Sequence, residues 1–121
     1  MKIAGALSWL AVAIASAGVG SLVQQAPPKT ATISNPLEDN VDARRAGAKL
    51  YAKECASCHG QRRSGLGKAP PLDRPDVYNA SPGALFWVLR NGSLRRGMPS
   101  FAHLPEAQRW QIVTYLRAQP K

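Results

Sequence analysis

Two cysteines and a histidine stand close enough together in this sequence to do chemistry as a unit. The segment Cys55-Ala56-Ser57-Cys58-His59 places two thiols two residues apart, with an imidazole directly after the second. This spacing allows the thiols to reach both vinyl groups of a haem while the adjacent imidazole binds the iron. The chain has no further cysteine. The motif therefore predicts one covalent haem c, attached through Cys55 and Cys58 and ligated by His59.

Three other interpretations of these residues compete with haem attachment. A thioredoxin-like exchange site uses the same cysteine spacing, usually beside alternating strands and helices, and no strand pattern precedes Cys55. A zinc site would need a fourth ligand besides the two thiols and His59, and the other imidazole in the chain is His103. A plain disulfide is chemically possible in an exported protein. The adjacent histidine and the lack of strands favour haem.

The elements that must position this motif are predicted to be helices. One follows capping residues at 39–42, one spans 81–92 and one runs from 104 onward, each with cap or Pro signals at its start. Pro and Gly between 61 and 79 exclude long regular structure and predict a wrapped loop there. The fold class is therefore all-α. The predicted helix faces consist of Ala43, Ala46, Gly47, Leu50 and Tyr51, then Leu85, Phe86, Val88 and Leu89, and finally Ala107, Trp110, Ile112, Val113, Tyr115 and Leu116.

The N-terminal part of the chain is typical of an exported protein. Residues 1–23 place Lys2 before an apolar run, as in a signal peptide, and the run is nearly long enough to span a bilayer of about 30 Å as a retained anchor. Residues 24–40 are rich in Pro, Thr, Ser and Asn and are predicted to be a flexible linker. Residues 41–121 form the expected domain. In either case that domain lies outside the cytoplasm, in the periplasm or tethered to the inner membrane.

The segments on both sides of the motif give the chain a resemblance to the class I, mono-haem cytochrome c family. Gly47 and Tyr51 before the motif are similar to the family's N-terminal helix, and Trp110 and Tyr115 to its C-terminal helix. The resemblance covers nearly everything from 41 to 119. It implies a small cytochrome c fold in which these two helices cross and the loops wrap around one haem.

The resemblance also implies roles for two loop residues. Pro70-Pro71-Leu72 is similar to the family's loop beside the proximal histidine, so the Pro70 carbonyl would accept a hydrogen bond from the second ring nitrogen of His59. Gly97-Met98-Pro99 resembles the loop that supplies the sixth iron ligand, which makes Met98 that ligand. The other methionine is Met1, in the export segment. His103 is the alternative ligand and would give an iron of lower potential.

A His and Met pair would leave no open position on the iron, so we expect a single-electron carrier and no catalysis. The resemblance is closest to small exported cytochromes that accompany periplasmic dehydrogenases of alcohols or sugars, including quinone-cofactor enzymes. Such an enzyme is the expected donor, and a respiratory acceptor such as a terminal oxidase the expected recipient. The alternatives are a cytochrome subunit of a dehydrogenase complex, and a haem sensor or peroxidase if Met98 is not a firm ligand.

The charge of the chain bears on its partners. Its 16 Lys and Arg against 7 Asp and Glu give a formal charge of +9. Export argues against a nucleic-acid partner, and membrane contact is expected only through a retained N-terminal segment. Basic residues near the motif and near Met98 are expected to ring the haem edge, where they serve either solubility alone or the steering of the protein toward an acidic partner. These residues are Arg62, Arg63, Lys68, Arg95 and Arg96.

Overall fold

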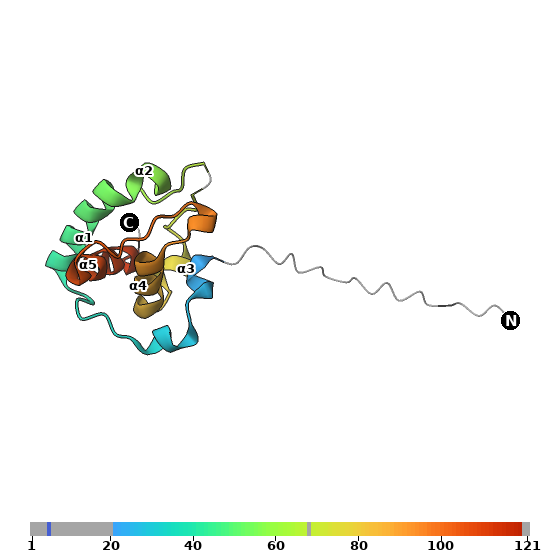
Figure 1. The fold of residues 1–121 in the computed structure, drawn as a ribbon, viewed down its shortest axis with the longest axis horizontal. Helices are drawn as coiled ribbons and strands as arrows, with labels where there is room; N and C mark the ends of the chain where they lie inside the picture. Colours follow the sequence, from blue (N-terminus) through green and yellow to red (C-terminus); the bar gives the residue numbers. More distant parts are fainter. Residues whose placement is uncertain (1–4, 6–20, 68, 120–121) are drawn as a thin grey trace.

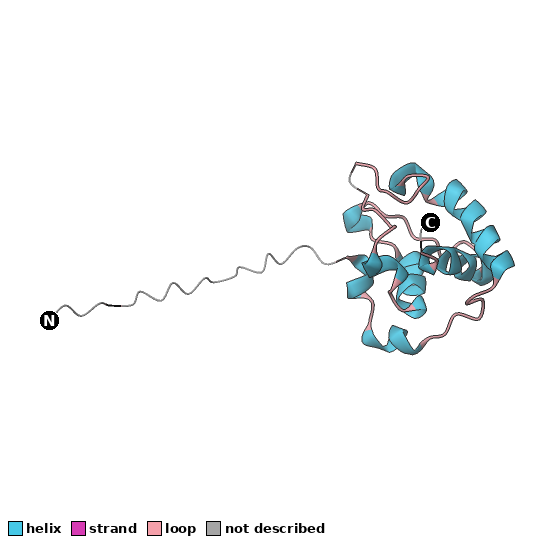
Figure 2. Ribbon diagram, turned by 180° about the vertical axis from the view of Figure 1, so that it is seen from behind, coloured by secondary structure: helices cyan, strands magenta, loops and turns pink. Residues whose placement is uncertain are grey.

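The computed structural model describes residue 5 and residues 21–67 and 69–119 (Figure 1). Within these ranges every regular element is a helix, and two isolated bridges are the only strand-like pairings (Figure 2). The predicted all-α fold is confirmed. The elements are η1 (Leu22–Gln25), η2 (Pro28–Thr32), α1 (Val41–Glu54), α2 (Ala56–His59), α3 (Pro75–Tyr78), α4 (Pro82–Asn91), η3 (Leu94–Arg96) and α5 (Glu106–Arg117).

The expected export segment, residues 1–23, lies almost entirely outside the described residues. Its assignment as a signal peptide or anchor therefore stays a prediction. Among the helices that the structure describes, none has the length and apolar character needed to cross a membrane.

Helix α1 crosses α5, and the crossing depends on a glycine. The Asn40 side chain caps α1 by accepting a hydrogen bond from the backbone N–H of Ala43 at 2.8 Å. Gly47 is buried, and a Cβ there would collide with the carbonyl of Gln111 and lie 2.9 Å from the Cβ of Tyr115. The two backbones can approach this closely only because glycine has no side chain. The predicted crossing of the N- and C-terminal helices is confirmed.

Helix α4 packs between the N-terminal residues and α5. The Ser81 hydroxyl accepts a hydrogen bond from the Ala84 backbone N–H at 3.3 Å, and Pro82 occupies the first turn, as the sequence predicted. Its apolar face joins those of α1 and α5 in one core. The buried members of that core are Tyr51, Cys55, Ala56, Val77, Leu85, Leu89, Phe101, Trp110, Ile112, Val113 and Leu116.

Residues 21–40 pack as a strap over α4 and α5, and they include the segment 24–40 for which the sequence predicted a flexible linker. Thr30 and Asn35 are buried, and the Asn35 side chain donates to the Thr114 hydroxyl at 2.9 Å. That hydroxyl in turn donates to the Leu37 carbonyl at 3.1 Å. Glu38 forms an ion pair of 3.0 Å with Arg117. These bonds join residues almost 80 positions apart, so no local pattern in the strap could reveal them.

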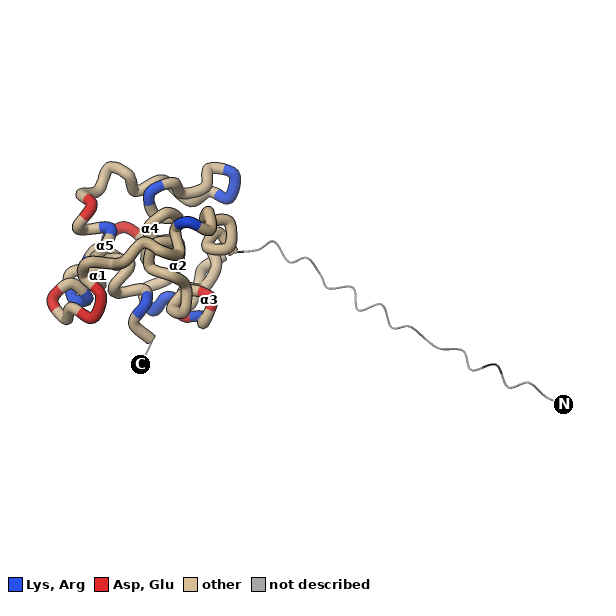
Figure 3. The backbone as a smooth tube through the Cα atoms, turned by 90° about the horizontal axis from the view of Figure 1, so that it is seen from below, with Lys and Arg blue, Asp and Glu red and all other residues tan. Residues whose placement is uncertain are grey.

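The basic residues do not all lie where the sequence suggested. Figure 3 shows Lys and Arg positions on several sides of the domain. Arg62, Arg95 and Arg96 are exposed, but Arg63 is buried, with 6% of its surface exposed. Lys68 lies outside the described residues. Because Arg63 is buried, it is not one of the exposed cations that the expected ring around the haem edge would need.

Candidate functional site

The two thiols and the imidazole lie on one short helical turn that continues from α1. Cys55 ends α1 and precedes α2, and its carbonyl accepts hydrogen bonds from the backbone N–H groups of Cys58 at 3.2 Å and His59 at 2.9 Å. Both thiols are free; the Cys55 side chain is buried and that of Cys58 is exposed. The turn thus holds one thiol against the core and presents the other, with the imidazole following directly.

The imidazole of His59 is oriented by the loop that the resemblance singled out. Its Nδ1 lies 2.8 Å from the carbonyl oxygen of Pro70. A carbonyl oxygen only accepts, so Nδ1 carries the proton and donates it. In the neutral ring Nε2 is then unprotonated, with its lone pair available to a metal ion. The hydrogen bond between His59 and Pro70 that the resemblance implied is present.

The turn after His59 is tied to α1 by a buried tyrosine. The Tyr51 hydroxyl donates to the Gly60 carbonyl at 2.7 Å, and the backbone N–H of Gly65 donates to the His59 carbonyl at 2.8 Å. Burial, followed by the charges of nearby Cys55 and Tyr115, raises the pKa of Tyr51 well above its usual range. The phenol therefore stays protonated and remains a donor at any physiological pH.

Met98 lies on a different loop and closes a small hairpin. Ser93 and Met98 exchange two backbone hydrogen bonds of 2.9 Å, with η3 between them and Gly97 in the left-handed region at φ 79°. The Met98 side chain is half-buried and packs against the core that contains Cys55 and Ala56. The structure thus brings Cys55, Cys58, His59 and Pro70 together on one side, and sets Met98 on a separate loop that faces the same core.

The competing metal ligand, His103, is exposed and lies beside Phe101, with 6.1 Å between the ring centroids. In the part of the chain that the structure describes, no three His, Cys, Asp or Glu side chains gather in a way that could hold a metal ion. The zinc interpretation requires such a group.

The environment of Cys55 differs from that of an exchange thiol. Burial, followed by the charge of Glu54, raises the pKa of the Cys55 thiol to about 12. Reactive cysteines in exchange proteins are accessible and have a lowered pKa, because the thiolate is the nucleophile. At neutral pH the first cysteine of this motif is a buried, protonated thiol, which disfavours thiol exchange.

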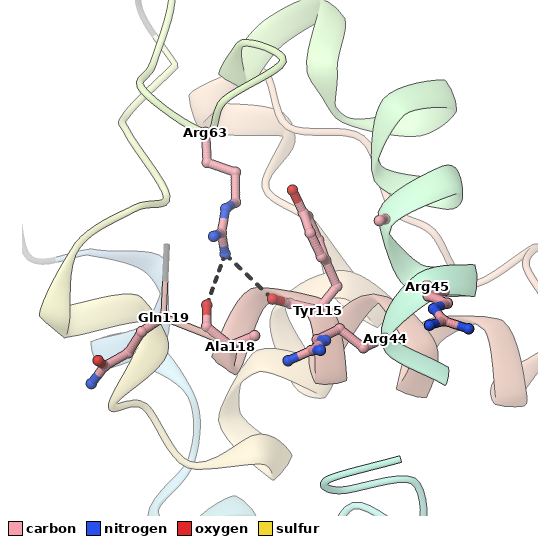
Figure 4. Close-up of a pocket in the computed structure, with 7 residues that line it drawn as sticks. Arg44, Arg45, Arg63, Tyr115, Ala118 and Gln119 are labelled. Atoms are coloured by element: carbon pink, nitrogen blue, oxygen red, sulfur yellow. Dashed lines mark hydrogen bonds between the residues drawn. The ribbon is translucent and has the colours of Figure 1, made fainter. Parts of the chain in front are cut away.

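Sequence reasoning missed the role of Arg63. Its guanidinium Nη1 donates to the carbonyls of Tyr115 at 3.3 Å and Ala118 at 3.2 Å, and it lies over the Tyr115 ring (Figure 4). Arg63 is buried and is not a surface cation that could steer a partner, although an arginine in a Gly-rich loop looks like one in the sequence. Its acceptors stand more than 50 residues further along the chain.

With the fold and this geometry described, the class of protein follows from comparison with known families. Residues 42–116 match the family model described as cytochrome c oxidase, cbb3-type, subunit III. The match covers well over half of the chain, and the protein belongs to this family of cytochrome c domains. The family is one of haem-bearing electron carriers.

Individual proteins of known identity are similar to parts of this chain. It is 33% identical over 87 residues to the quinohemoprotein alcohol dehydrogenase ADH-IIG of Pseudomonas putida, covering 70% of this chain but only 12% of that protein. Cytochrome cL of Methylophaga aminisulfidivorans matches with a TM-score of 0.60 and 25% identity, over 81% of this chain and 67% of the other. Cytochrome cL of Hyphomicrobium denitrificans has the same fold, with a TM-score of 0.56 and 18% identity, over 81% and 66% of the two chains.

Proposed function

We propose that this protein is a single-electron carrier with one covalent haem c. Cys55 and Cys58 would form the two thioether bonds, His59 would ligate the iron through Nε2, and Met98 would supply the sixth ligand. The observation that carries the proposal is the 2.8 Å contact between Nδ1 of His59 and the Pro70 carbonyl, which leaves Nε2 as the ligating nitrogen on the same turn as both thiols. A family match across residues 42–116 supports it.

The residues present fit such a group in chemistry and in surroundings. Two free thiols, an oriented imidazole and a thioether are the donors that a c-type haem takes. The loop that carries Pro70 exposes a leucine, with Leu66 55% exposed. Apolar surface at this place suits contact with a large apolar cofactor. When bound, the haem would supply reversible one-electron chemistry at its iron.

The chain's own residues would then set the properties of the site. The hydrogen bond from His59 to Pro70 raises the basicity of the ligating nitrogen and fixes the ring direction. A thioether from Met98 favours a higher reduction potential than a second histidine would. If His59 and Met98 both ligate the iron, no ligand position would remain for a substrate or for oxygen, and the protein would transfer electrons without being an enzyme.

We infer that the electron donor is an exported alcohol dehydrogenase with a quinone cofactor. The supporting observation is the 33% identity to a segment of a quinohemoprotein alcohol dehydrogenase. A respiratory acceptor, such as a terminal oxidase, would receive the electron in the periplasm. The same relative favours a second candidate, a cytochrome subunit docked on a dehydrogenase, because there the matching segment is part of the dehydrogenase chain itself.

The ligand set is tested by absorption spectra of the haem-loaded protein. Thioether-ligated ferric haem shows a weak long-wavelength band, and we expect it in the wild type and not in Met98→Ala. His103→Ala is the matched control, since it removes the competing ligand, and it should keep the band. A wild type that lacks the band and binds carbon monoxide readily would contradict His59/Met98 ligation and favour a sensor or peroxidase.

The donor is tested by mixing the ferric protein with a quinone-cofactor alcohol dehydrogenase and its alcohol. Reduction should be rapid and should slow as salt is added, because the carrier is basic. Gel filtration of the same mixture separates the two candidates. A carrier elutes alone, whereas a docked subunit elutes with the dehydrogenase. Absence of reduction at low salt would contradict this donor.

A further inference from the structure

The backbone of Arg63 has a conformation that side chains rarely tolerate. Its φ is +62°, in the left-handed region, where the Cβ of an L-residue crowds the following carbonyl. One other non-glycine among the described residues, Asp39, shares this sign of φ. The Arg63 residue is also 6% exposed, although it carries a full charge. Such a position is kept only where surrounding contacts determine it.

The side chain supplies one set of these contacts. The carbonyls of Tyr115 and Ala118, which accept from Nη1 at 3.3 and 3.2 Å, stand at the C-terminal end of α5. The Tyr115 carbonyl also accepts from the backbone N–H of Ala118 at 3.2 Å, and the helix dipole makes this end of α5 attractive to a cation. The guanidinium carbon lies 4.7 Å from the centroid of the Tyr115 ring. Figure 4 shows the side chain reaching from its loop down to the helix end.

The main chain of Arg63 joins the two ends of the loop around His59. Its N–H donates to the carbonyl of Gly60, the residue after His59, at 3.1 Å. Its carbonyl accepts from the N–H groups of Leu72 at 2.7 Å and Asp73 at 3.1 Å, just beyond Pro70. One residue therefore holds the segment that carries the imidazole and the segment that carries its hydrogen-bond acceptor.

We propose that Arg63 is a positioning residue for the iron ligand. By fixing residues 60–73 to the end of α5, its guanidinium keeps the Pro70 carbonyl on Nδ1 of His59. This inference rests on the proposed role of His59 as the axial ligand. It follows that a change at the end of α5, far along the sequence from the haem motif, is transmitted to the hydrogen bond that orients the ligand.

The experiment measures how often that hydrogen bond opens. In the haem-loaded, ferrous full-length protein, the solvent-exchange rate of the His59 Nδ1 proton is followed by NMR. This proton exchanges only when its contact with Pro70 opens, so we expect Arg63→Met to exchange at least about tenfold faster than wild type. Arg63→Gly also removes the left-handed strain. It should exchange as fast as Arg63→Met, because the lost contacts of the side chain carry the effect.

The matched control is Arg117→Met. Arg117 is another arginine at the end of α5, but its contacts are Glu38 at 3.0 Å and the Ala80 carbonyl, both outside the loop of residues 60–73. We expect it to lower the midpoint of chemical unfolding while leaving the His59 proton at the wild-type exchange rate. Equal acceleration in Arg117→Met and Arg63→Met would reduce Arg63 to a general stabiliser and overturn the proposal.

The outcomes separate this inference from the proposed function. If His59 shows haem-shifted ring resonances in every variant and exchange is unchanged in Arg63→Met and Arg63→Gly, the positioning role is overturned and the electron carrier stands. If the wild type itself shows no haem-shifted His59 resonance, the ligand assignment is overturned, and the positioning role with it. Should Arg63→Met not fold, Arg63→Lys takes its place. It keeps the charge without the planar fork, and should give a rate between those of wild type and Arg63→Gly.

Discussion

The loops on the two sides of the proposed iron site are held in different ways. The His59 loop, residues 59–73, is bound to α1 through Tyr51 and to α5 through Arg63. The Met98 loop, residues 93–101, is closed by the hydrogen bonds between Ser93 and Met98. Near its end, the N–H of Phe101 and the hydroxyl of Ser100 donate to carbonyls of α4, from which the loop emerges.

The two loops differ in how far along the sequence their hydrogen-bond partners lie. To release the histidine side, hydrogen bonds to two helices far apart in the sequence must break, whereas the backbone hydrogen bonds described for the methionine side lie within its own hairpin and to the adjoining helix α4. Segments with few buried long-range contacts open at lower free-energy cost. From its hydrogen bonds we expect the methionine side to open more easily than the histidine side, with Phe101 anchoring the end of its loop in the core.

The largest expected effect comes from replacing the two cysteines that would attach the haem on the His59 side. Cys55 belongs to the buried core, and a small domain of this size depends on a cofactor for much of its buried surface. We expect the double variant Cys55→Ala and Cys58→Ala to lack haem and to show little helix by circular dichroism. A variant with native helix content would show that the polypeptide folds without haem. It would then contradict the view that the His59 side depends on haem attachment.

A pair of glycine substitutions tests the comparison directly. Gly65 (φ 86°) and Gly97 (φ 79°) are both left-handed, but a Cβ at Gly65 would lie 2.9 Å from the nitrogen of Pro71, whereas a Cβ at Gly97 would meet nothing within 4 Å. Gly97→Ala should therefore cost only the backbone penalty, roughly 1–2 kcal/mol. Gly65→Ala adds steric conflict, for a total of roughly 2–5 kcal/mol.

The two free energies are measured by denaturant unfolding of the haem-loaded proteins. The carbon monoxide affinity of the same samples reports on the methionine side, and it should rise in Gly97→Ala alone. Equal losses of unfolding free energy in both variants would mean that the two loops are packed alike.

Removing one hydroxyl from the histidine side gives a smaller effect. In Tyr51→Phe the buried Gly60 carbonyl keeps the N–H of Arg63 as a donor but loses the tyrosine hydroxyl, and the loss of one such hydrogen bond costs about 0.5–1.5 kcal/mol. Tyr115→Phe serves as the control. It removes a hydroxyl of the neighbouring tyrosine, whose ring lies 5.3 Å away, and that hydroxyl takes part in none of the hydrogen bonds recorded for the described residues. The free energy of unfolding should fall clearly in Tyr51→Phe only. Similar values in both variants would contradict a stabilising role for the hydrogen bond from Tyr51 to Gly60.

The sequence was informative where structure depends on near neighbours. The caps at Asn40 and Ser81, the periodic faces of α1, α4 and α5, and the close approach at Gly47 all follow from short spacings. The thiols and His59 were found because attachment chemistry requires that spacing. The His59 contact to Pro70 came from family resemblance, since nothing local to Pro70 predicts it.

The features that the sequence did not reveal depend on partners far along the chain. The strap of residues 21–40 has no helical or alternating period, and its attachment to α5 comes from hydrogen bonds such as that between Asn35 and Thr114. Arg63 was misplaced for the same reason, because its acceptors belong to the end of α5. Residues in loops rich in Gly and Pro carry no periodic signal, so their burial becomes visible only in the folded chain.

The smallest expected effect lies in the Met98 loop, at Leu94, and it tests how firmly that loop is packed. Leu94 is 93% exposed, so Leu94→Ser removes almost no buried surface and should change the free energy of unfolding by no more than about 0.5 kcal/mol. Leu89→Ser is the contrasting variant, because Leu89 is buried in α4 below the same loop. Denaturant unfolding of the haem-loaded proteins measures both. A loss above about 1 kcal/mol in Leu94→Ser would mean that this side chain is covered in the loaded protein, and the methionine side would then be more firmly packed than the present contacts indicate.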